Sequence, residues 1–244
     1  MHFEKGIWSA ALDICKRNSG AVAAYVGLMM VIGLAQDFIS SSGGLAVAQA
    51  FAAALLAIPA HLSVLKNIDS GTGMKMVGDN KVFGQFVWRG FGLGFLALIV
   101  PFVVLFGLLI ADSQNVVLAF GAFGLLAALL AAAIFAKWGT MLPAIVVGND
   151  KRFATAGQRG SHSFGYAFPR LLLSFGGVSL LMILLAVLVG QMSNGDGRFF
   201  PDGGVDAGAI LSALAGNVVG AYQVALTAVI LSRAYLMAEA KTAA

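Results

Sequence analysis

Residues 113–136 read SQNVVLAFGAFGLLAALLAAAIFA, and this stretch decides the class of fold. It contains no charged side chain and no alternation of polar and apolar positions. An α-helix rises about 1.5 Å per residue, so about 20 such residues cross a hydrocarbon core roughly 30 Å thick. The strands of a membrane barrel would alternate with a period of two instead. The stretch therefore predicts a transmembrane helix.

Five further uncharged windows of similar length occur in the 244-residue chain, at residues 18–36, 38–65, 90–111, 171–195 and 207–232. The whole chain is 59% hydrophobic and 11% charged, whereas about a quarter of the residues of a soluble domain are charged. We therefore expect an all-α polytopic integral membrane protein. Its six transmembrane helices would form three hairpins.

The charges indicate the orientation of these hairpins. With six spans, 14 of the 15 Lys and Arg residues fall on the side that both termini share, together with 6 of the 11 acids. Only Arg198 lies on the other side, among five aspartates. The positive-inside rule then places both termini in the cytoplasm. Topology explains the excess of cations, so we expect no nucleic-acid partner.

Segments outside the spans predict amphipathic helices on the cytoplasmic face of the membrane. On a helical wheel, the apolar face of residues 3–17 holds Phe3, Ile7, Ala10, Ala11 and Ile14. The apolar face of residues 151–168 holds Phe153, Gly157, Gly160, Phe164 and Phe168. A third, less regular segment follows residue 81. Helices of this kind lie among the lipid headgroups, so the cationic candidates for binding those headgroups are Lys81, Arg89, Lys151, Arg152 and Arg159.

The second and third of these segments align at an offset of 70 residues. The identical pairs are Val77/Val147, Gly78/Gly148, Lys81/Lys151, Phe83/Phe153, Arg89/Arg159 and Gly90/Gly160. The repeated unit would be an interfacial helix followed by a transmembrane hairpin. We expect a single membrane domain, 1–244, with the parts 1–19 (interfacial helix), 20–66 (first hairpin), 76–136 (interfacial segment and second hairpin) and 150–236 (interfacial helix and third hairpin).

Residues 139–147 read GTMLPAIVV and run directly into the amphipathic segment. This turn resembles bacterial six-helix inner-membrane families, which include the membrane domain fused to some glycerophosphodiester phosphodiesterases. The resemblance implies a bacterial inner-membrane protein. The phosphodiesterase domain is absent from this chain, so no catalytic residue carries over.

The polar residues inside the predicted spans are candidates for an intramembrane site, because buried polar groups are costly in a membrane. They are Gln49, His61, Asn217 and Gln223. Hydrogen bonds between helices are the favoured explanation for neutral amides in such positions. The single Cys15 and the three scattered histidines predict neither a redox pair nor a metal site, and no pattern indicates a cofactor or catalytic residues.

The sequence thus predicts a protein that is not an enzyme. We expect a lipid-contacting scaffold or an accessory subunit of a membrane complex, with membrane lipids and other integral membrane proteins as partners. The alternative is a transporter or channel for a small or lipidic solute, which the prolines and amides of the spans would suit.

The predicted topology can be tested with alkaline phosphatase, which is active only in the periplasm. A fusion at the C-terminus should be inactive, and a fusion after Asp112, between the third and fourth spans, should be active. Activity of the C-terminal fusion would contradict the cytoplasmic assignment.

Overall fold

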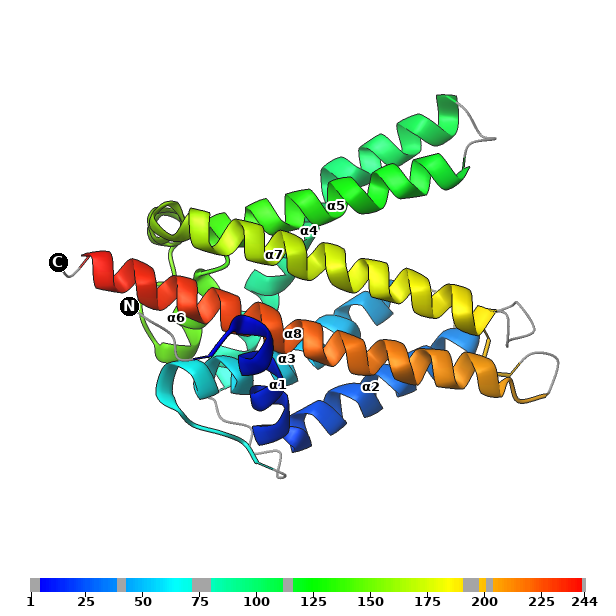
Figure 1. Ribbon diagram of the computed structural model, residues 1–244, viewed down its shortest axis with the longest axis horizontal. Coiled ribbons are helices and arrows are strands. Elements are labelled where there is room, and N and C mark those ends of the chain that lie inside the picture. The colour runs from blue at the N-terminus through cyan, green and yellow to red at the C-terminus, as the bar shows by residue number, and fades with distance from the viewer. Residues whose placement is uncertain are drawn as a thin grey trace. The chain divides into compact units, whose positions relative to one another are not determined.

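The computed structural model describes residues 5–38, 43–71, 80–111, 116–190, 198–200 and 204–242. These residues form eight α-helices and no strand (Figure 1). The helices are α1 (Ile7–Arg17), α2 (Ser19–Phe38), α3 (Gly43–Lys66), α4 (Asn80–Ala111), α5 (Val116–Trp138), α6 (Met141–Val147), α7 (Phe153–Gly190) and α8 (Ala207–Thr242). Six of them, all except α1 and α6, are long and apolar enough to cross a membrane. The prediction of an all-α, multi-pass membrane protein is confirmed.

The chain forms two compact units. Unit 1 contains residues 80–176 and 230–244, and unit 2 contains residues 2–79 and 177–229. The helices α7 and α8 contribute residues to both units. The division therefore falls within helices.

Two of the three predicted interfacial segments are parts of longer helices, and the first one lies directly before a longer helix. Residues 81–89 and 153–168 are the first turns of α4 and α7, and only Asn18 separates α1 from α2. In Figure 1 the first turns of α7 are seen end-on. Pro169 lies inside this helix and has no N–H to donate. Phe3 and residues 76–79 lie outside the described residues, and the position of these segments relative to a membrane stays a prediction.

Small residues allow the helices of unit 2 to pack closely. Its core joins α2, α3 and α8 through Ala21, Tyr25, Ala52, Leu56 and Ala221. A Cβ atom on Gly220 would lie 2.9 Å from the Tyr25 hydroxyl oxygen, and one on Gly216 would lie 3.0 Å from Met182 Cε. The G-x-x-x-G step of α8 therefore serves packing within the chain.

Two aspartates organise the residues before α8 in unit 2. The Asp37 carboxylate accepts the backbone N–H groups of Phe199 at 2.8 Å and Phe200 at 3.2 Å. Asp206 caps α8, because its carboxylate accepts the N–H of Ala209 at 2.9 Å. The N–H of Asp206 in turn donates to the Phe199 carbonyl at 3.0 Å.

In unit 1, α7 crosses the end of α5 at close range. A Cβ atom on Gly160 would overlap the carbonyl oxygen of Lys137, and one on Gly157 would lie 3.3 Å from Trp138 Nε1. The helical wheel predicts both glycines on a face that enters the lipid. The structure packs them against α5 instead, because only glycine allows the two backbones to approach this closely.

Replacing Gly160 should therefore destabilise the protein. We expect Gly160→Ala to lower the free energy of unfolding by about 1–3 kcal/mol, since the new methyl group meets rigid backbone. Gly165→Ala is the matched control, because nothing lies within 4 Å of a Cβ atom there. Alanine favours helix over glycine, so the control should be neutral or stabilising. Unfolding of the purified protein in detergent measures both, and equal effects would contradict the close crossing.

Candidate functional site

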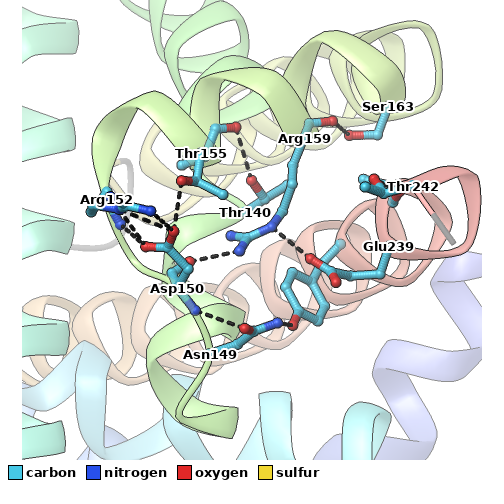
Figure 2. Close-up of polar contacts among 12 residues, drawn as sticks. Thr140, Asn149, Asp150, Arg152, Thr155, Arg159, Ser163, Glu239 and Thr242 are labelled. Atoms are coloured by element: carbon cyan, nitrogen blue, oxygen red, sulfur yellow. Dashed lines mark hydrogen bonds and ion pairs between the residues drawn. The ribbon is translucent and has the colours of Figure 1, made fainter.

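A network of polar side chains surrounds residues 149–152, which connect α6 to α7 (Figure 2). Residues 141–146 of α6 are buried. Gly148 ends this helix with a φ of 78°, in the left-handed region that glycine adopts without strain. The N–H of Asn149 then donates to the Ala144 carbonyl at 2.9 Å. The chain thus leaves α6 through a defined turn.

Asp150 orders the start of α7. Its carboxylate accepts the backbone N–H of Arg152 at 3.0 Å, the Thr155 hydroxyl at 2.8 Å and the Arg152 guanidinium at 2.8 Å. The hydrogen bonds from Arg152 and Thr155 hold the pKa of Asp150 well below its usual range. Asp150 is therefore an ionised capping residue and not a proton donor at neutral pH.

Arg159 joins the start of α7 to the end of α8. Its side chain is buried, with an exposed fraction of only 6%. Nε donates to the Glu239 carboxylate at 2.7 Å, and Nη2 donates to the Asp150 carbonyl at 2.6 Å. The guanidinium also lies over the Tyr235 ring, 5.2 Å from its centroid. Figure 2 shows Arg159 extending between the two helices toward Glu239.

Arg89 holds the same connection from α4. Nη1 donates to the Lys151 carbonyl at 3.0 Å, and the guanidinium lies 5.5 Å from the centroid of the Phe153 ring. The Lys151 ammonium donates back to Gln85 of α4. We call residues 149–152, together with Arg89, Arg159, Tyr235 and Glu239, the Asp150 clamp. It joins α4, α6, α7 and α8 within unit 1.

A second network, the Asn18 clamp, lies in unit 2. It consists of Asn18, Ser63, Asp69 and Ser70. The amide of Asn18 is buried, donates to Ser63 at 2.9 Å and accepts the N–H of Ser70 at 2.8 Å. Ser63 donates to the Asp69 carboxylate at 2.7 Å. This clamp fixes the segment after α3 to the junction of α1 and α2.

The structure places the five predicted headgroup ligands in different surroundings. Lys81 and Arg152 are exposed, whereas Arg89 and Lys151 are half-buried and bonded within the Asp150 clamp. Arg159 lies inside the protein and is paired with Glu239. In this arrangement the Arg159 guanidinium is not available to lipid.

The four predicted intramembrane residues belong to unit 2. His61 is buried, Asn217 and Gln223 are half-buried, and Gln49 is exposed. Gln223 donates to Thr227, one turn further along α8, at 3.4 Å. Gln49 and His61 do not share an environment, although both lie on α3.

Two further kinds of site can be checked among the described residues: a metal site and a reactive cysteine. Within the described ranges, no three His, Cys, Asp or Glu side chains could hold a metal ion together. Burial raises the pKa of the Cys15 thiol, which keeps it protonated and poorly reactive. Sequence reasoning missed Glu239 and Tyr235 of the Asp150 clamp. Their partners are 80 or more residues away, and no local pattern indicates such pairs.

No protein-family model, curated protein or solved structure matches the chain significantly. The resemblance carried by residues 139–147 accordingly stays a prediction. In the structure, these residues are the turn after α5 and the buried helix α6.

Removal of the Arg159 guanidinium should weaken unit 1. We expect Arg159→Met to lower the free energy of unfolding by about 1–3 kcal/mol, because Glu239 and the Asp150 carbonyl lose their charged donor. Arg152→Met is the matched control, since its side chain is 81% exposed and an exposed ion pair contributes about 0–1 kcal/mol. Thermal unfolding in detergent compares the variants. An Arg152→Met loss as large as that of Arg159→Met would contradict the larger contribution of the buried Arg159.

Proposed function

We propose that this protein is a non-enzymatic component of the bacterial inner membrane, with both termini in the cytoplasm. It acts as a lipid-contacting scaffold or as an accessory subunit of a membrane complex. The charge distribution and the resemblance of residues 139–147 support this location. The proposed function rests on two observations: which apolar side chains are exposed, and which groups the polar side chains bind.

The observation that carries the proposal is the exposed apolar surface of α4 and α5. The exposed fractions of Phe95, Val103, Phe106 and Leu125 are 60%, 67%, 62% and 74%. An apolar surface of this kind is stable only against lipid tails or another transmembrane helix. The hairpin of α4 and α5 therefore has a large area for contacts outside the chain.

The polar side chains support a role without catalysis. Asp150, Arg159 and Glu239 bind one another or backbone groups, and Asn18 and Asp69 do the same in unit 2. Such contacts hold helices together and do not point reactive groups toward a substrate. A structural or accessory role requires only these contacts between helices and the exposed apolar surface.

Photo-crosslinking in native membranes tests the proposal. A photoreactive residue at Phe95, on the exposed face of α4, should form crosslinks to lipid and to one reproducible integral membrane protein. Leu93 is the matched control, because it lies on the same helix and is fully buried. There the probe should react only within the chain. Loss of the captured protein's assembly when this chain is deleted would support the accessory role.

Two outcomes would contradict the proposal. The first is a Phe95 probe that captures only lipid, in membranes where deletion of the chain alters no membrane complex. The second is solute flux into liposomes that contain the purified protein, with loss of that flux in Asn217→Leu. The second result would establish the transporter alternative, because Asn217 is half-buried within α8.

A further inference from the structure

Two lysines from different helices donate to two adjacent, exposed residues of α7. The face of α7 with Ala156, Gly160 and Ser163 is buried, whereas Ser161 and His162 are exposed. The ammonium of Lys137, near the end of α5, donates to the Ser161 hydroxyl. The ammonium of Lys241, near the end of α8, donates to the His162 carbonyl at 3.0 Å. All four residues belong to unit 1.

Neither ammonium forms an ion pair with an acid among the residues that the structure describes. The ion pairs of the described residues are Lys5–Asp13, Arg17–Asp69, Arg152–Asp150 and Arg159–Glu239. Lys137 and Lys241 bind uncharged oxygen atoms instead, and each ammonium has three donors. Both lysines therefore keep a full charge and further donors for an external acceptor.

The surroundings strengthen the attraction for an anion. The described part of unit 1 contains two acids, Asp150 and Glu239, and both are already paired. It contains nine cations: Lys81, Arg89, Lys137, Lys151, Arg152, Arg159, Arg170, Arg233 and Lys241. Such a surplus raises the local concentration of anions.

We propose that Lys137, Ser161, His162 and Lys241 form a binding site for the phosphate group of an anionic phospholipid. Two ammonium groups, each with further N–H donors, suit a tetrahedral oxyanion that carries several acceptor oxygens. Phe164 and Phe168 stack on each other one to two turns further along α7, with ring centroids 5.2 Å apart, and both are half-buried. They offer an apolar surface for an acyl chain, which favours a lipid over a soluble phosphate.

This site rests on the lipid-contacting part of the proposed function and gives it a chemical specificity. It also differs from the headgroup ligands that the sequence predicts. Those five residues leave out Lys137, which is the last charged residue before the turn into α6, and Lys241 near the C-terminus. Arg159, by contrast, is engaged inside the protein.

Ligand titrations of the purified full-length protein in a neutral detergent test the site. The probes are short-chain phosphatidic acid, the phosphatidylcholine of the same chain length, and inorganic phosphate. Thermal unfolding and native mass spectrometry measure binding. Phosphatidic acid should bind and stabilise the wild-type protein at concentrations at which phosphatidylcholine and inorganic phosphate have little effect.

The double variant K137A/K241A should bind phosphatidic acid at least about tenfold more weakly, because two charge-assisted contacts are lost. K137R/K241R should retain most of the affinity. K16A/K66A is the matched control, since it removes two exposed lysines of unit 2 and should bind as the wild type does. Circular dichroism without lipid checks that each variant is folded.

Three results would overturn the site: equal affinity of K137A/K241A and wild type, equal loss in K16A/K66A, or equal binding of phosphatidylcholine. Inorganic phosphate that binds as tightly as phosphatidic acid would overturn the lipid as the ligand. The crosslinking experiment at Phe95 is independent of these measurements. A captured partner without phosphatidic acid selectivity would refute the site alone, and selectivity without a partner would refute the accessory role alone.

Discussion

The burial of one charged side chain, Arg159, determines how the helix ends of unit 1 are arranged. An isolated charge inside a protein is costly, so a buried guanidinium needs acceptors on several sides. Glu239 of α8 accepts from Nε, the carbonyl of Asp150 accepts from Nη2, and the guanidinium lies over the Tyr235 ring. These partners fix the start of α7 against the end of α8, and the connection before α7 cannot move without breaking a charged contact. The adjacent Gly160 allows α5 to approach from the neighbouring side of the same turn.

The transmembrane helices could be predicted from the sequence because hydropathy is a local property. A window of about 20 apolar residues predicts a transmembrane helix whatever the sequence of the neighbouring segments. The partner of each helix face could not be predicted in this way. A helical wheel separates apolar from polar positions, but it does not distinguish lipid from a neighbouring helix. Gly157 and Gly160 were therefore expected to face lipid, although they form the close contact with α5.

The candidate site shows the same limit for polar residues. On the helical wheel of residues 151–168, Arg159 lies on the polar side, as expected for a charged side chain. The wheel does not identify the residue that Arg159 binds. That partner is 80 residues away, so the pair becomes visible only when both helices are placed. The repeat at an offset of 70 residues was more informative. Arg89 and Arg159 are aligned in it, and both donate to carbonyls of the 149–152 connection while lying over an aromatic ring. The glycines that follow them differ, because Gly90 has open space where Gly160 meets backbone.

Polar contacts at helix ends have a particular importance in a protein of this composition. Lipid tails are as apolar as leucine, so burial of apolar surface gives little preference for one helix arrangement over another. Specific arrangements must come from close packing at small residues and from polar pairs, and the two clamps supply such pairs in their own units. Both acids among the described residues of unit 1, Asp150 and Glu239, form ion pairs within the Asp150 clamp. The cations outnumber these acids, so the unit keeps a positive charge that its own side chains cannot balance. Neutralisation then has to come from outside this unit, and in a membrane the headgroups of acidic lipids are abundant anions.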